Sequence, residues 1–257
     1  LLAPWLAPHD PTAFHLRNRL APPAWAGGTS EFLLGTDQLG RDLASRLLYG
    51  ARISLIVGFL GVLVSTIIGV VLGLIAGYYG GLVDNVLSRI IDTFMAIPFI
   101  VLALAAIAVI GPQGGNSILI LVLVLGATGW VTFARVVRGE VLGVKALEYV
   151  EAARALGQRH FWIIVRHVFP NVTGPIIVLT TLNVASVIIA ESSLSFLGLG
   201  VQPPTVTWGV MLSDGRGHLA TSWWLATFPG IAITLTTLGM IMLGDWLRDL
   251  LDPRMQT

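Results

Sequence analysis

The chain has 257 residues, of which 55% are hydrophobic and only 11% are charged, and this depletion of charge excludes an ordinary soluble domain of this size. The formal net charge of +1 argues against nucleic acid as a partner. No cysteine is present, which excludes disulfides, thiolate metal sites and cysteine nucleophiles.

Residues 1–52 predict the end of one transmembrane span followed by an extracytoplasmic segment. The opening LLAPWLAP resembles the tail of an apolar helix, so we expect most of a first span to be missing from this chain. The rest is polar and rich in turn residues. Arg41 to Tyr49 predict a short amphipathic helix capped by Thr36 or Asp37. We expect it to seat the chain at the membrane interface; contact with a ligand is the alternative.

Residues 53–82 contain no charged residue and predict the next span, because about 20 apolar residues cross a bilayer core. Small residues recur every fourth position in this stretch, at Gly61, Ser65, Gly69, Gly73 and Gly77. Such a stripe lets a neighbouring helix approach closely. Packing without a transport role is the favoured interpretation.

Two further spans are predicted at residues 93–111 and 117–138. Pro98 should kink the first of them. Asp92, at its start, is a candidate pathway residue; capping of the helix end or pairing with an Arg such as Arg89 is the alternative.

Residues 140–170 predict a loop built from two short helices that meet at Gly157. Ala146, Val150, Ala153 and Gly157 fall on one face of the first helix, and such a face of small residues can lie in another protein's groove. Gly157 can adopt the left-handed conformation that ends a helix. Pro170 should end the second helix, with the preceding residue extended.

The last spans are predicted at residues 172–191 and 223–247. Residues 192–222 between them are too mixed to cross the bilayer and predict an extracytoplasmic, interfacial or re-entrant segment, and residues 248–257 predict a cytoplasmic tail. Glu191 is a second candidate pathway residue, with capping or an ion pair as the alternative.

No catalytic constellation is present in the sequence. The phosphate-binding pattern GxxxxGK[ST] is absent, Lys145 is the only lysine, and the five histidines lack metal-ligand spacing, so we predict no metal site. Ser213, Asp214 and His218 are neighbours in sequence, which does not make a triad. We therefore expect no enzyme activity and no cofactor in this chain, and energy supplied by another polypeptide.

The loop carries a family pattern. Glu151-Ala152-Ala153, Gly157 and Pro170 resemble the coupling loop of the membrane subunits of bacterial ABC importers, with His167 and Phe169 as two departures. The resemblance implies that the loop is cytoplasmic and docks on an ATPase subunit. An ordinary cytoplasmic loop is the alternative. The residues that it assigns to ATPase coupling are Glu151, Ala152, Ala153, Arg154, Gly157, Arg159 and Pro170.

Other strings extend the resemblance over most of the chain. APPAW, LGTDQLGRD, QPPTVTWG, TFPG and GDWLRDLLDP are similar to the dipeptide, oligopeptide and nickel importers, and most similar to their second ("C") permease subunit. The resemblance implies one domain over residues 1–257, a type I ABC importer transmembrane domain of about six helices. It also implies a homologous second permease subunit, two ATPase subunits that bind ATP and Mg, and an extracytoplasmic substrate-binding protein. The substrate stays open among dipeptides, oligopeptides, nickel chelates and glutathione-like molecules.

Charge gives the expected orientation in a bacterial inner membrane. With the coupling loop inside, nine of the fifteen Lys and Arg are cytoplasmic, in agreement with the positive-inside rule. The alternative function is an ion-gradient-driven secondary transporter or channel, which needs ionisable residues in mid-membrane. The predicted spans have only Asp92, Glu191 and Asp245, all near span ends. A membrane hydrolase is disfavoured because no nucleophile and base are placed together.

Overall fold

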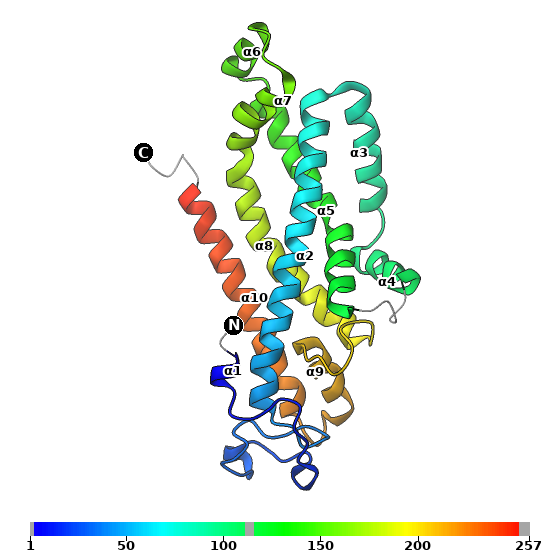
Figure 1. The fold of residues 1–257 in the computed structure, drawn as a ribbon, viewed down its shortest axis with the longest axis vertical. Helices are drawn as coiled ribbons and strands as arrows, with labels where there is room; N and C mark the ends of the chain where they lie inside the picture. Colours follow the sequence, from blue (N-terminus) through cyan, green and yellow to red (C-terminus); the bar gives the residue numbers. More distant parts are fainter. Residues whose placement is uncertain (1–2, 111–115, 252–257) are drawn as a thin grey trace. The chain divides into compact units, whose positions relative to one another are not determined.

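The structure is a computed structural model that describes residues 3–110 and 116–251, and this part of the chain is helical (Figure 1). The expectations for residues 1–2, for the turn at 111–115 and for residues 252–257 of the tail lie outside the described residues. The helices are α1 (Ala3–Leu6), α2 (Leu43–Tyr79), α3 (Gly81–Met95), α4 (Phe99–Ile110), α5 (Ser117–Val144), α6 (Glu148–Ala155), α7 (His160–Ile163), α8 (Phe169–Phe196), α9 (Trp208–Gly215) and α10 (Trp224–Leu251).

The chain divides into two compact units. Among the described residues, the first unit comprises 3–59, 107–110, 116–121 and 185–239, and the second comprises 60–106, 122–184 and 240–251. Five helices contribute residues to both units: α2, α4, α5, α8 and α10.

Four of the five expected spans are long apolar helices. They are Leu43–Tyr79, Ser117–Val144, His160–Phe196 and Trp224–Leu251. The first is 37 residues long and absorbs the amphipathic segment that the sequence assigns to a separate helix. Neither Thr36 nor Asp37 caps it. Asp42 does, since its Oδ2 accepts from the backbone N of Ser45 at 2.9 Å.

The fifth expected span, residues 93–111, is divided. Helix α3 continues to Met95, α4 begins only at Phe99, and the two axes differ by 89°. Pro98 has no N–H to extend the α3 ladder, and it disfavours the helical conformation in the residue before it. The proline therefore breaks this segment instead of kinking one continuous helix.

Pro170 does not end a helix, contrary to the expectation. The chain turns without interruption from α7 through a π-helical turn, Ile164–Val168, into α8, and Phe169 is helical with φ −55° and ψ −45°. The backbone N of Phe169 donates to the carbonyl O of Ile164, five residues back. The wider turn makes room for the proline ring, so the helix continues through it.

The glycine stripe packs α2 against α5 within the second unit. A Cβ built on Gly73 would lie 2.7 Å from the backbone O of Ala134 and 2.8 Å from Cβ of Val137. Gly69 and Gly77 are equally crowded by α5 residues, Gly69 by Trp130, Phe133 and Ala134 and Gly77 by Arg138 and Val141. The stripe thus serves close helix packing, as the sequence predicts.

Polar bonds to Thr36 and Asp37 of the LGTDQLGRD string fasten the segment before α2 within the first unit. The buried Arg46 guanidinium donates to Asp37 Oδ2 at 2.6 Å and to Asp214 Oδ2 of α9 at 3.1 Å. Trp224 Nε1 donates to the backbone O of Thr36 at 3.2 Å. These internal bonds support the structural role expected for the string.

Candidate functional site

The loop at residues 140–170 is ordered by a helix C-cap at Gly157. Helix α6 ends at Ala155, and Gly157 has φ +76°. The backbone N of Gly157 donates to the O of Arg154, and that of Gln158 donates to the O of Ala153, at 3.0 and 3.2 Å. This pair of bonds is the Schellman motif, in which glycine is favoured because a side chain is strained at positive φ. The predicted left-handed glycine is confirmed.

Two of the four residues on the predicted small-residue face, Val150 and Ala153, pack inward. Val150 is fully buried and Ala153 is 8% exposed, and both belong to one apolar cluster with Val141, Ile163 and Val168. Ala146 and Gly157, the other two, are exposed. Val150 and Ala153 therefore seat α6 on its own chain, and docking of this face in a partner's groove stays a prediction.

Aromatic contacts that the sequence did not suggest hold α6 and α7 at the end of α2. Tyr78 Oη and His160 Nδ1 are 2.9 Å apart, and the Arg154 guanidinium lies 5.7 Å from the centroid of the Tyr78 ring. A hydrogen bond also joins His167 Nε2 and Gln158 Oε1 at 3.1 Å. The only sequence signal for this arrangement is a tyrosine pair, Tyr78–Tyr79, at the end of an apolar run.

The exposed surface of the loop combines charge with large apolar side chains. Of the seven residues assigned to coupling, Ala153 is buried and the other six are exposed. Pro170 lies in α8, apart in sequence from the α6 turn. Beside the exposed coupling residues, the largest exposed apolar side chains are Leu156 (87%), Phe161 (64%) and Trp162 (54%). We name Glu151, Arg154, Leu156, Arg159, Phe161 and Trp162 the loop surface.

Asp92 lies in the last turn of α3 and pairs across to α5. Arg135 Nη2 donates to its Oδ1 at 2.7 Å, and both side chains are more than half exposed. The partner is therefore Arg135 and not Arg89, and Asp92 does not start a helix. A pathway role for Asp92 stays a prediction.

Glu191 lies inside α8, which continues to Phe196, and its carboxylate is fully buried. Three hydroxyls donate to it: Ser195 at 2.7 Å, Ser54 of α2 at 3.3 Å and Ser192 at 3.4 Å. The backbone N of Trp208, at the start of α9, donates to the Ser54 hydroxyl at 3.2 Å. In the part of the chain that the structure describes, no Lys or Arg pairs with Glu191, so it joins α2, α8 and α9 through hydroxyls. A pathway role for Glu191 stays a prediction.

Replacing Glu191 by alanine is expected to destabilise the folded subunit by about 2–4 kcal/mol, because it opens a cavity and leaves buried hydroxyls without an acceptor. Glu191→Gln keeps the shape and one acceptor oxygen and should cost less than about 1 kcal/mol. Thermal unfolding of the purified complex in detergent measures both changes. Equal losses for the two variants would contradict a stabilising role for the hydroxyl bonds to Glu191.

Within residues 3–110 and 116–251, no group of three or more His, Asp or Glu side chains is arranged to hold a metal ion.

Comparison with known proteins identifies the family. Residues 69–257 match the family described as "Binding-protein-dependent transport system inner membrane component". The chain is 46% identical over all its 257 residues to the dipeptide transport system permease protein DppC of Escherichia coli K12, covering 84% of that protein. It is 40% identical to the di/tripeptide transport system permease protein DppC of Pseudomonas aeruginosa UCBPP-PA14, again over the whole chain and 84% of the relative.

Solved structures support the fold. A chain of the MetNI methionine ABC transporter in an inward-facing conformation matches with a TM-score of 0.66 at 19% identity, over 80% of this chain and 96% of the other. A chain of an amino acid ABC transporter matches with a TM-score of 0.60 at 17% identity, over 79% and 92%. The expected architecture, an importer transmembrane domain of type I, is confirmed. The chain belongs to the family of inner-membrane components of binding-protein-dependent transport systems.

Proposed function

We propose that this chain is one permease subunit of an ATP-driven importer of dipeptides and oligopeptides. The observation that carries the proposal is the 46% identity to a dipeptide permease along the entire chain. Together with a homologous second permease subunit it would form the translocation pathway. A separate extracytoplasmic binding protein would deliver the peptide.

The energy would come from two ATPase subunits that bind ATP and Mg, since this sequence has no phosphate-binding loop. We place the loop at residues 140–170 in the cytoplasm, on the side favoured by the distribution of Lys and Arg. ATP-driven closure of the ATPases would move this loop and, through it, the membrane helices, which is a rigid-body route to alternating access.

The loop surface is the proposed docking site for an ATPase subunit. Three large apolar side chains flanked by Glu151, Arg154 and Arg159 give the mixture expected of a partner interface, where aromatic anchors supply affinity and charges fix orientation. The inward packing of Val150 and Ala153 and the bond between Tyr78 and His160 hold that surface firmly on the membrane helices. A movement of the docked ATPase would therefore reach α2 and α8 directly.

Reconstitution tests the proposal. The chain is coexpressed with its partner permease, ATPases and binding protein, and the complex is placed in proteoliposomes with a radiolabelled dipeptide outside. Uptake is expected to require ATP and the binding protein and to persist after a protonophore collapses ion gradients. Uptake driven by an ion gradient without ATP would instead establish the secondary-transporter alternative.

A further inference from the structure

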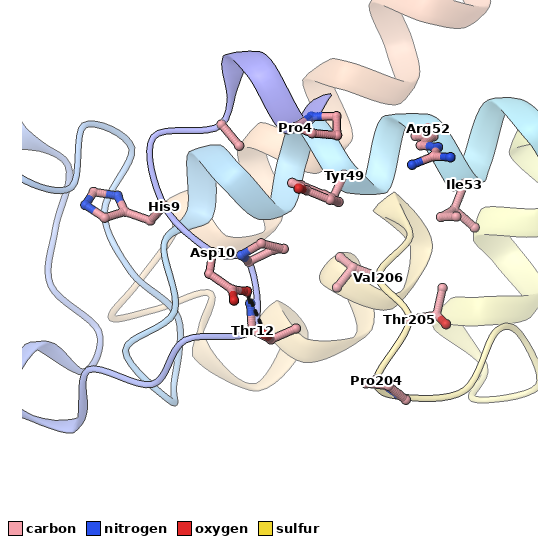
Figure 2. Close-up of a pocket in the computed structure, with 12 residues that line it drawn as sticks. Pro4, His9, Asp10, Thr12, Tyr49, Arg52, Ile53, Pro204, Thr205 and Val206 are labelled. Atoms are coloured by element: carbon pink, nitrogen blue, oxygen red, sulfur yellow. Dashed lines mark hydrogen bonds between the residues drawn. The ribbon is translucent and has the colours of Figure 1, made fainter. Parts of the chain in front are cut away.

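A cavity of about 590 Å³ lies within the first unit, at the start of α2 (Figure 2). Three segments form its walls: the N-terminal segment with His9 and Asp10, helix α2 with Tyr49 and Arg52, and residues 204–206 before α9. Its volume falls within the range of small-molecule sites, roughly 300–1,000 Å³.

The N-terminal wall presents a carboxylate with a free oxygen. Thr12 donates through its backbone N and its hydroxyl to the same atom, Asp10 Oδ1, at 2.7 and 2.6 Å. These two bonds lower the pKa of Asp10 below its ordinary value, so the group is ionised at neutral pH. The other oxygen, Oδ2, has no hydrogen-bond partner among the described residues and can accept from a ligand.

The wall formed by α2 presents a cation without a partner. The two arginines that most closely precede it in the sequence are paired: Arg41 Nε and Arg46 Nη1 each lie 2.6 Å from Asp37 Oδ2. Arg52 is exposed beside the cavity and forms no ion pair or hydrogen bond with the residues that the structure describes. Figure 2 shows its guanidinium on a different segment from Asp10. A guanidinium so placed can bind a carboxylate through two parallel hydrogen bonds.

Much of the remaining lining is apolar or aromatic. Tyr49, Ile53, Pro204 and Val206 offer surface to an uncharged side chain, and His9 and Thr205 add polar groups. A site for a simple anion would need only the arginine, and a site for a simple cation only the aspartate. Opposite charges on different walls of one cavity, with apolar surface in the same lining, match a molecule that carries both charges and a side chain.

We propose that this cavity binds a short zwitterionic peptide, with the peptide carboxylate on Arg52 and its ammonium group on Asp10. The proposal rests on the proposed function and adds to it a peptide site on the permease itself, separate from the binding protein. The peptide would occupy the cavity before it enters the membrane pathway.

Photoaffinity labelling tests the site without the binding protein. The complex of both permeases and ATPases in lipid nanodiscs is illuminated with alanyl-photoleucine, a dipeptide that carries a diazirine, and the adducts are located by mass spectrometry. Adducts are expected on residues 49–53 and 204–206, and excess alanyl-leucine should remove them. Arg52→Gln and Asp10→Asn should each lower labelling at least about tenfold, as expected for a lost charge-assisted bond. The matched control Arg17→Gln removes an exposed arginine of the same unit that does not line the cavity and should label normally.

Modified peptides assign the two charges. Alanyl-leucine amide, which lacks the C-terminal carboxylate, should compete more weakly than alanyl-leucine for the wild-type cavity. On Arg52→Gln the amide and the unmodified dipeptide should compete equally. N-acetyl alanyl-leucine should show the same pattern with wild type and Asp10→Asn. Competition by glycerophosphoethanolamine but not by the dipeptide would overturn the proposal in favour of a lipid headgroup. Labelling that is absent from the cavity, in a complex that still imports dipeptide with ATP, would overturn the site and leave the proposed function intact. Labelling in the cavity of a complex without ATP-driven uptake would support the site and contradict the proposed function.

Discussion

Replacing Gly73 by alanine is expected to destabilise the subunit by about 1–3 kcal/mol, the usual cost of overpacking. The added Cβ would lie 2.7 Å from the O of Ala134, 2.8 Å from Cβ of Val137 and 3.1 Å from the N of Arg138. Two of these three atoms belong to the α5 backbone, so no rotamer change relieves the contact and the helices must separate. The measurement is the thermal unfolding midpoint of the purified complex, together with the amount of subunit that reaches the membrane.

Gly139→Ala is the matched control for this variant. Gly139 lies on α5, and a Cβ there would meet nothing within 4 Å in the described part of the chain. Because alanine favours a helix over glycine by about 0.5–1 kcal/mol, this substitution should leave stability unchanged or raise it slightly. Equal unfolding midpoints for Gly73→Ala and wild type would contradict the close packing of α2 on α5.

Replacing Gly157 by valine is expected to lower ATP-driven uptake about tenfold or more while the complex still assembles. Gly157 has φ +76°, and a residue with a Cβ pays about 1–2 kcal/mol there, more if it is β-branched. A Cβ would meet no atom within 4 Å, so the effect arises from the backbone and not from a clash. The strained turn changes the direction from α6 to α7 and with it the relative positions of Leu156 and Phe161. Uptake and peptide-stimulated ATPase activity in proteoliposomes measure the loss.

Gly157→Asn separates conformation from side-chain size. Asparagine adopts the left-handed conformation more readily than other residues with a side chain, so this variant should retain most of the uptake. If valine and asparagine were equally harmful, the loop surface and not the turn would explain the defect. Wild-type uptake in Gly157→Val would count against a coupling role for the α6–α7 turn.

The sequence was sufficient wherever local chemistry decides the structure. Long apolar stretches predicted five membrane spans, four of which are single long helices, and glycine spacing predicted the close packing of α2. The left-handed Gly157 followed from the need to end α6 without strain. The motif of Glu151-Ala152-Ala153 and Gly157 also led to the family, because it is a pattern of residue types at fixed spacing.

Prolines show where local rules fail. Pro98 and Pro170 carry the same lack of an N–H, yet one separates α3 from α4 and the other lies within a continuous helix. The difference is the π-helical turn before Pro170, which is a property of the surrounding packing and not of the dipeptide.

Burial also lay beyond the sequence. The small residues of α6 could have faced a partner or their own chain, because an amphipathic pattern is the same in both cases. Only the cluster of Val150 and Ala153 with Ile163 and Val168 shows that these two pack inward. Glu191 is similar, since its hydroxyl partner Ser54 lies 137 positions away in the chain.

By itself, then, the sequence determined that this protein is helical, crosses a membrane and belongs to an importer family. The first two properties depend on composition and short-range spacing, and the third on strings that resemble those of a known family; all are visible along the chain. The tertiary structure alone decided which face of each helix is exposed, which acid has a partner, and that Asp10, Arg52 and Val206 line one cavity. Such contacts join residues far apart in sequence, and their energy depends on distances that no single stretch of the chain contains.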